Sequence, residues 1–284
     1  MNIQELIQES KIPLLETELL LAFLMTKPRE FIIVHQSEIV SPTIIKKFKA
    51  AEKKRLLNWP LAYLIGYKEF YSLNFKVNKN VLIPRPETET LVEIILNHAS
   101  HQKTGLDFLD IGTGSGTIII TLAHELKKQT ETIFNNSSFL GLDISKAAVN
   151  VARQNAKAHN LDKKIAFLES NLLHRLPCKS LKDSNLVITA NLPYLTKKQI
   201  NSEPSISREP KLALDGGAAG LKYYQQLFQQ LKKVAFSSLF MICEIDPEQA
   251  NTIKIKAQKI WPTARLKIIK DLRQQSRFLT VKIN

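Results

Sequence analysis

The feature that most constrains the fold is an alternation of short apolar runs with helical segments, which begins near residue 106. The runs at 106–110, 139–143, 165–168, 186–189 and 239–243 are typical of buried strands, and the segments at 117–126, 145–158, 221–236 and 247–260 are typical of helices. Strands that alternate with helices indicate an α/β fold with a mostly parallel sheet. Two last strands, at 265–269 and 278–283, are joined by a short polar turn, which predicts an antiparallel edge.

A glycine-rich loop follows the first strand and opens a helix. Asp110 ends the strand, and the loop consists of Gly112, Thr113, Gly114, Ser115 and Gly116. Glycines allow the backbone to approach a ligand closely. Such a loop alone is weak evidence for a nucleotide site. The close spacing of its glycines, after an acid at the strand end, nevertheless fits an amino-acid-bearing nucleoside better than a pyrophosphate.

Polar residues also follow the next three strands. Asp143 ends the second strand, where an acid binds ribose hydroxyls in doubly wound folds. The third strand leads into 169–172, which places Asn171 and Leu172 where an adenine ring would lie. Asn191 ends the fourth strand. Because open α/β sheets bind ligands at the carboxyl ends of their strands, we expect these groups to share one site.

The run after the fourth strand predicts a cup for a planar nitrogen group. Asn191 is followed by Leu192, Pro193 and what we expect to be an exposed aromatic, Tyr194. An Asn amide both accepts and donates hydrogen bonds, and Pro193 holds the Leu192 carbonyl in an extended orientation. Two acceptors and a flat ring would suit methylation of an amide or amino nitrogen.

The first part of the chain reads differently. Residues 1–60 show helical spacing without a strand, and Ser41-Pro42 is a typical helix start. Alternation at 70–81 predicts a β-hairpin connector. Arg85 and Glu87 then lie in a proline-punctuated segment, which is either a plain helix start or a pair of ligand-binding residues beside a cleft.

Charge and composition restrict the setting of the protein. Lys and Arg number 40 against 26 Asp and Glu, a net charge of +14, which favours proximity to RNA or ribosomes or else reflects a solvated lysine-rich surface. Lys46, Lys47, Lys49, Lys53, Lys54 and Arg55 form one basic helix face with the same two interpretations. Cys178 and Cys243 show no metal or disulfide spacing, and the six histidines are scattered. We therefore expect a cytoplasmic monomer without metal, targeting segment or membrane span.

Taken together, these motifs resemble the protein-glutamine N5-methyltransferases of the HemK/PrmC type. The matching positions are 60–66, 69–70, 83–89, 110–116, 143, 191–194, 209–210, 213–214, 216–217, 220–221, 244 and 249. The resemblance implies a Rossmann-like class I methyltransferase domain at 86–284, a β-hairpin linker at 63–85 and a helical substrate-recognition domain at 1–62. It also implies S-adenosylmethionine as cofactor, S-adenosylhomocysteine as product, and the glutamine of the Gly-Gly-Gln motif in bacterial class 1 release factors as substrate.

The resemblance assigns roles to individual residues. It implies a catalytic role for Asn191, Pro193 and Tyr194, with Leu192, Arg85 and Glu87 also in contact with substrate. The cofactor would be bound by the loop residues 112–116, Asp143, Asn171, Leu172 and Asn191. In this interpretation Asn191 Oδ1 and the Leu192 carbonyl accept the two amide hydrogens, and Tyr194 packs against the amide plane.

Three features of the sequence depart from the family pattern. Leu192 stands where the family usually has the first proline of Asn-Pro-Pro-Tyr, and it restores a backbone N–H. Asp246 and Ser237-Ser238 replace common glycines in the scaffold. Because Asn-Leu-Pro-Tyr also occurs in ribosomal RNA adenine dimethylases, methylation of an adenine N6 in RNA or DNA is the main alternative.

Two other functions compete with release-factor methylation. One is methylation of a glutamine in a ribosomal protein, and the other is a non-catalytic ribosome-binding module. About a hundred residues precede the glycine-rich loop, and the segment 83–89 belongs to the glutamine-modifying type. These two features favour glutamine over adenine as the methylated group. The segment 86–89 favours the release-factor branch over the ribosomal-protein branch. The intact glycine-rich loop, Asp143 and the Asn191 cup argue against a non-catalytic module.

Overall fold

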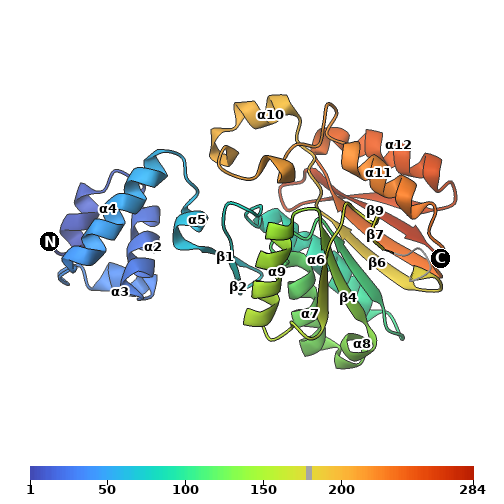
Figure 1. Ribbon diagram of the computed structural model, residues 1–284, viewed down its shortest axis with the longest axis horizontal. Coiled ribbons are helices and arrows are strands. Elements are labelled where there is room, and N and C mark those ends of the chain that lie inside the picture. The colour runs from blue at the N-terminus through green and yellow to red at the C-terminus, as the bar shows by residue number, and fades with distance from the viewer. Residues whose placement is uncertain (177–180) are drawn as a thin grey trace. The chain divides into compact units, whose positions relative to one another are not determined.

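The computed structural model describes residues 1–176 and 181–284, so Cys178 lies outside the described residues. The chain divides into two compact units, which are described separately below (Figure 1). The helical unit comprises Met1–Tyr67 with Glu203–Arg208, and the sheet unit comprises Lys68–Ser202 with Glu209–Asn284. Within the described ranges no helix is long and apolar enough to cross a membrane.

The helical unit packs five short helices around one apolar core. They are α1 (Ile3–Glu9), α2 (Leu14–Met25), α3 (Arg29–Val34), α4 (Pro42–Leu56) and α5 (Leu61–Ile65). As predicted, Ser41 caps α4: its Oγ accepts the Ile44 N–H at 3.4 Å, and Pro42 occupies the first turn. The buried side chains that hold the unit together include Leu6, Leu20, Leu21, Ile32 and Phe48.

The basic face of α4 is partly neutralised inside this unit. Arg55 donates two hydrogen bonds to Glu16, at 2.5 and 2.8 Å. Lys49 lies 3.6 Å from Glu9 and 3.7 Å from Glu52. The predicted single-sign face therefore carries acidic partners at two of its six cations.

Residues 203–208 belong to the helical unit although they come late in the sequence. This segment includes η3 (Pro204–Ile206). Arg208 donates to the Leu57 carbonyl at 3.1 and 3.3 Å and lies over the Trp59 ring. The sequence contains no local signal for this association, because the two partners are far apart along the chain.

A seven-stranded sheet forms the centre of the sheet unit (Figure 1). Its order is β5 (Ile165–Glu169), β4 (Ser138–Asp143), β3 (Asp107–Ile111), β6 (Asn185–Ala190), β7 (Ser238–Glu244), β9 (Ser276–Ile283) and β8 (Arg265–Lys270). Neighbours from β5 to β7 are parallel, and β9 is antiparallel to both β7 and β8. The predicted mostly parallel sheet with an antiparallel C-terminal strand is confirmed, and β8 is the edge.

Helices cover both faces of the sheet, which explains why its strands read as continuous apolar runs. One face packs against α6 (Glu89–Ser100), α7 (Thr117–Gln129), α8 (Glu131–Asn136) and α9 (Lys146–Ala158). The other packs against α11 (Lys222–Leu231) and α12 (Ala250–Ile260). In β3, Phe108 points to the first face and Leu109 to the second, the two-residue period of a strand.

Two helix boundaries differ from the sequence prediction. The helix predicted to reach residue 236 ends at Leu231, its last fully buried side chain, and the chain turns there. The helix predicted from 247 starts as η5 (Pro247–Gln249), because Pro247 sets a tight first turn that the Asp246 side chain caps. The remaining short elements are the hairpin β1 (Tyr67–Phe70) and β2 (Leu73–Lys76), η1 (Pro86–Thr88), α10 (Lys197–Ser202) and η4 (Lys211–Ala213).

The strand order determines where a ligand can bind. From β3 the chain moves outward to β4 and β5, then returns to place β6 on the other side of β3. The loops that follow β3 and β6 therefore diverge and leave a crevice between them, at the carboxyl ends of the strands. The glycine-rich loop follows β3, and Asn191 follows β6.

Candidate active site

The glycine-rich loop forms one wall of a cavity at this crevice. Gly112, Gly114 and Gly116 have φ values of 76°, 55° and 79°, in the left-handed region that glycine tolerates. The N–H groups of Gly112 and Thr113 both donate to the Leu142 carbonyl at 2.8 Å. These bonds attach the loop to the end of β4 and hold its backbone against the cavity.

Asp110 stabilises the glycine-rich loop through a hydrogen bond to Thr113. Its carboxylate is 1% exposed and accepts the hydroxyl protons of Thr113 at 2.6 Å and Thr189 at 2.7 Å. Burial raises the pKa of Asp110 to about 6, although the two hydroxyls oppose the shift. Asp110 therefore ties the loop after β3 to the neighbouring strand β6.

Asp143 lines the cavity at the end of β4, where the sequence predicts a ribose-binding acid. Its two oxygens accept the N–H of Gly114 at 2.9 Å and of Ser145 at 2.8 Å. Burial raises the pKa of this carboxyl. Each carboxylate oxygen has a further lone pair, so both remain able to accept a hydroxyl from a ligand.

Asn171 and Leu172 lie on the cavity wall after β5. Leu172 is buried and has a φ of 52°, a rare conformation for a branched apolar residue. Such strain is found most often at ligand sites. The turn brings this backbone to the position predicted for an adenine-binding wall.

Asn191 lies at the end of β6 with its NH₂ group directed at Glu244 and Thr88. Its Nδ2 donates to Glu244 Oε2 at 3.1 Å and to Thr88 Oγ1 at 3.4 Å. The side chain also lines the cavity. Because the NH₂ group is directed at Glu244, the carbonyl oxygen Oδ1 is the end left to accept a ligand hydrogen.

The N–H that Leu192 restores has a buried partner. It donates to the Tyr224 hydroxyl at 3.1 Å, and both residues are buried. That hydroxyl has one proton, and its shortest contact is with the Glu244 backbone carbonyl. The Leu192 carbonyl, 3.5 Å from the same hydroxyl, is therefore left as a second acceptor beside Asn191. The Leu192 side chain packs on Gly112, where an added β-carbon would lie 3.0 Å from Cδ2.

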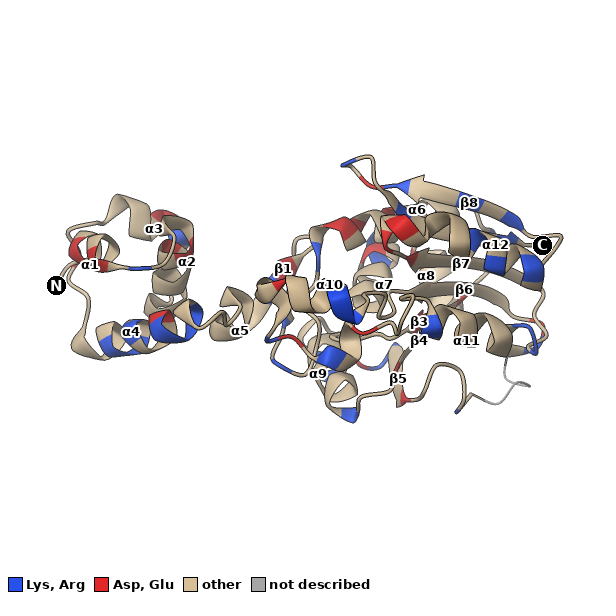
Figure 2. Cartoon of the chain, turned by 90° about the horizontal axis from the view of Figure 1, so that it is seen from above, with Lys and Arg blue, Asp and Glu red and all other residues tan. Residues whose placement is uncertain are grey.

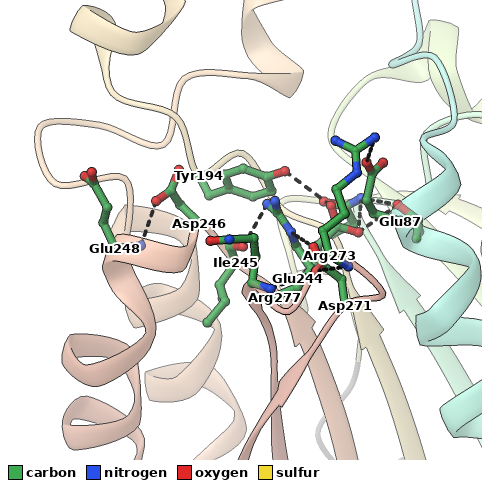
Figure 3. Close-up of polar contacts among 12 residues, drawn as sticks. Glu87, Tyr194, Glu244, Ile245, Asp246, Glu248, Asp271, Arg273 and Arg277 are labelled. Atoms are coloured by element: carbon green, nitrogen blue, oxygen red, sulfur yellow. Dashed lines mark hydrogen bonds and ion pairs between the residues drawn. The ribbon is translucent and has the colours of Figure 1, made fainter.

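Tyr194 is half-buried, not exposed as the sequence analysis predicted. Its hydroxyl donates to Glu244 Oε1 at 3.2 Å (Figure 3). Its carbonyl accepts from Gln249 Nε2 at 2.7 Å. Burial and the neighbouring Glu244 charge raise the pKa of the phenol. These contacts turn the ring into the protein, and Pro193 rather than Tyr194 lines the cavity.

Glu244 connects these groups, yet the sequence identified it only as a position matching the family. It ends β7 and is 2% exposed. Besides Asn191 and Tyr194, Thr88 donates to it at 2.7 Å. Nearby, Arg277 contacts Asp271 at 3.4 Å and the Ile245 carbonyl at 3.3 Å (Figure 3). Strand β7 has no motif that would have revealed this role, because its partners come from other elements.

Arg85 and Glu87 lie in different places. Arg85 lines the cavity and pairs with Glu209, whose carboxylate is buried and also accepts the Ile83 N–H at 3.0 Å. Glu87 is outside the residues that line the cavity and lies 3.7 Å from Arg273 (Figure 3). The structure therefore brings Arg85, but not Glu87, to the cavity wall.

The cavity has a volume of about 260 Å³ and a mostly apolar lining. Four of the five loop residues, 112–115, line it, together with the residues at the ends of β4, β5 and β6 described above. Sequence analysis did not assign the rest of the wall, which consists of Phe70, Thr88, Thr117, Ile118, Ile144, Ser145, Ala148, Ser170, Pro210, Leu212, Ala213, Tyr223 and the segment 79–84. Their positions depend on the hairpin and the loop after β6 folding over the sheet edge.

The parallel sheet, the glycine-rich loop and the acid after β4 define this protein as an S-adenosylmethionine-dependent methyltransferase. Comparison with known families agrees: residues 102–278 match a methyltransferase domain, and residues 2–66 match the PrmC N-terminal domain. The catalytic domain of hMettl16 in complex with an RNA hairpin has the same fold, with a TM-score of 0.57 at 13% identity over 92% of this chain and 90% of that one.

Curated relatives define the family more narrowly. A release factor glutamine methyltransferase of Moorella thermoacetica is 34% identical over 87% of this chain and 83% of its own. One of Staphylococcus aureus is 32% identical over 88% of this chain and 85% of its own. The chain belongs to the family of release factor glutamine methyltransferases.

Proposed function

We propose that this protein methylates the side-chain amide nitrogen N5 of the glutamine in the Gly-Gly-Gln motif of class 1 peptide chain release factors. The observation that carries the proposal is the pair of acceptors after β6. Asn191 has its NH₂ group engaged with Glu244 and Thr88, so that Oδ1 is available beside the Leu192 carbonyl. Two acceptors on adjacent residues match in number the two hydrogens of a primary amide.

The residues along the cavity fit S-adenosylmethionine. Asp143 retains lone pairs for ribose hydroxyls, the loop 112–116 offers close backbone approach, and Asn171 and Leu172 supply a wall for a base. When bound, this cofactor supplies a methyl group on a positively charged sulfur. No metal is needed for that chemistry.

The task of the protein is to orient a poor nucleophile. The lone pair of an amide nitrogen is delocalised into its carbonyl, which lowers its reactivity. Asn191 Oδ1 and the Leu192 carbonyl accept the two amide hydrogens and direct the nitrogen toward the loop after β3. Orientation of reactants can recover roughly 7–11 kcal/mol of a barrier. A methylated amide cation is very acidic, so no residue has to act as a strong base.

The other predicted substrate residues have less direct roles. Pro193 lines the cavity and holds the Leu192 carbonyl extended. Arg85 contributes to the wall next to Glu209. Stacking of Tyr194 on the substrate amide remains a prediction, and its observed hydroxyl contact with Glu244 supports an indirect role.

We further propose that the protein acts as a cytoplasmic monomer close to the ribosome or its RNA. The net charge of +14 supports this proximity. Figure 2 shows Lys and Arg gathered on α12 and β8, where Lys254, Lys259, Arg265 and Lys267 are exposed. A surface of this kind attracts polyanions in a salt-dependent manner.

The test uses labelled S-adenosylmethionine with purified release factor, its Gln→Ala variant at the Gly-Gly-Gln motif, and ribosomal RNA. We expect label in the intact factor alone. Label in RNA, or equal label in the Gln→Ala factor, would overturn the proposal.

A variant pair tests the acceptor directly. Asn191→Ala should abolish transfer while cofactor affinity stays within a few-fold, because the amide acts on the substrate. Asn251→Ala, on the exposed side of α12, is the matched control and should leave the rate unchanged. Near wild-type turnover by Asn191→Ala would show that the mechanism is wrong.

A further inference from the structure

We propose that Glu244 is a positioning residue that determines which end of the Asn191 amide faces the substrate. The inference rests on the proposed function, because it concerns the acceptor that holds the glutamine. Asn191 can present either an oxygen or an NH₂ group to the cavity, and only the oxygen can accept a hydrogen from a substrate amide.

The first step is the burial of Glu244 among donors. A buried carboxylate is costly unless it is hydrogen-bonded. Glu244 is 2% exposed and receives three side-chain hydrogens, from Thr88 at 2.7 Å, Asn191 at 3.1 Å and Tyr194 at 3.2 Å. These three donors come from η1 and from the segment after β6. The carboxylate thus holds these three side chains together beside the acceptor pair formed by Asn191 Oδ1 and the Leu192 carbonyl.

The second step concerns the direction of the Asn191 amide. An ionised carboxylate only accepts hydrogen bonds, so Asn191 must direct its NH₂ group toward Glu244. If the amide were rotated by half a turn, Oδ1 would face Glu244 Oε2, and the NH₂ group would face the NH₂ group of the substrate. In this rotated arrangement two acceptors would face each other at Glu244, and two donors would face each other at the substrate. Glu244 therefore selects the orientation that methyl transfer requires.

The third step explains how Glu244 itself is held. The Tyr224 hydroxyl donates to its backbone carbonyl, which attaches the end of β7 to α11. Arg277 on β9 stabilises its negative charge, whereas Glu87 on η1 opposes it, and burial raises the pKa of the carboxyl. Figure 3 shows Arg277 and Tyr194 beside Glu244, with Glu248 directed away from this group.

The experiment measures kcat for release-factor methylation, cofactor affinity by calorimetry, and thermal unfolding. Glu244→Gln keeps the shape of the side chain, but its amide can either accept from or donate to Asn191, so the selection is lost. We expect kcat to fall roughly 10- to 100-fold, as for other small misplacements of a reacting group, with cofactor affinity unchanged within about threefold. The matched control is Glu248→Gln, which removes the same charge from an exposed residue of η5 and should retain wild-type kcat.

A reciprocal exchange separates positioning from a merely structural role. Asn191→Asp alone places two carboxylates against each other and should lose transfer. In the Asn191→Asp/Glu244→Gln double variant, the new amide at 244 can donate to the new carboxylate at 191, which leaves an oxygen for the substrate. We expect the double variant to be at least about tenfold faster than Asn191→Asp, a non-additivity typical of contacting residues.

The outcomes distinguish the two proposals. If the wild type does not label the release-factor glutamine, the proposed function itself is wrong. If the wild type labels it and Asn191→Ala does not, but Glu244→Gln keeps wild-type kcat, the positioning role of Glu244 is overturned. A double variant no faster than Asn191→Asp would overturn it as well.

Discussion

The buried hydroxyl of Tyr224 offers a quantitative test of how the active-site loop is held. Tyr224 is fully buried on α11; its hydroxyl accepts the Leu192 N–H at 3.1 Å and donates to the Glu244 backbone carbonyl. Tyr224→Phe removes this one oxygen and keeps the ring. The substitution leaves the Leu192 N–H, in a residue 3% exposed, without its partner.

The expected cost follows from these two contacts. A buried donor that loses its partner costs about 1–3 kcal/mol, and the lost bond to the Glu244 carbonyl adds about 1 kcal/mol. We therefore expect Tyr224→Phe to lower the free energy of unfolding by about 3 kcal/mol. For a unit of this size, such a change lowers the midpoint of thermal unfolding by roughly 6–12 °C.

Tryptophan fluorescence can follow the unfolding of the sheet unit alone. The chain has two tryptophans: Trp59 lies in the helical unit, and Trp261 packs edge-on against Phe228 with ring centres 5.3 Å apart. A Trp59→Phe background leaves Trp261 as the reporter of urea and thermal unfolding. Tyr223→Phe is the control, since Tyr223 is half-buried and its hydroxyl has no hydrogen bond among the described residues.

A double-mutant cycle identifies the contact responsible. Leu192→Pro removes the N–H, so Tyr224→Phe should cost about 1–2 kcal/mol less in that background than in the wild type. A loss below about 0.5 kcal/mol for Tyr224→Phe alone, or full additivity with Leu192→Pro, would refute the reasoning.

Three further predictions concern the loop, the cavity wall and the turn behind Tyr194. Burial raises the pKa of Asp110 to about 6, above the value of about 3.9 in the unfolded chain. Between these two pH values the native state binds more protons than the unfolded state, so the free energy of unfolding falls as the pH rises from about 4 to about 6. Asp110→Asn should flatten that slope in urea titrations at a series of pH values; an unchanged slope would contradict it. Arg85→Met leaves Glu209, 1% exposed, without its cation and should cost about 3 kcal/mol, most of which Glu209→Gln should restore. Gly220→Ala would bring a β-carbon to 2.1 Å from the Tyr194 carbonyl oxygen and should reduce both kcat and stability. Gly66→Ala is the control: its β-carbon would meet no atom within 4 Å, so at a φ of 90° it should show only the backbone strain of about 1–2 kcal/mol.

Much of the site was predictable from local pattern. Strands buried on both faces leave continuous apolar runs in the sequence, and the residue after each run must lie at the same edge of a parallel sheet. This reasoning predicts that the loop 112–116, Asp143, Asn171 and Asn191 surround one ligand. The structure places Asn191, Asp143, Asn171 and most of the loop around one cavity.

Other features depended on strand order, which local pattern does not encode. Thr88 and Glu244 meet Asn191 although they lie 103 and 53 residues from it, and Tyr224 meets Leu192 across 32 residues. These contacts exist because β7 pairs with β6 and α11 packs beneath them. They also turn Tyr194 inward, where its sequence context had suggested an exposed ring.

The sequence by itself determined the fold class, the edge of the sheet where the cavity lies and the residue that we propose to hold the substrate nitrogen. Apolar periodicity and the polar or glycine residues that follow each strand are local properties of the sequence, so they can be read along the chain. Only the tertiary structure decided which way the Asn191 amide points and what binds the Leu192 N–H. Those depend on buried partners from β7, η1 and α11, which are adjacent to β6 in space but not in sequence.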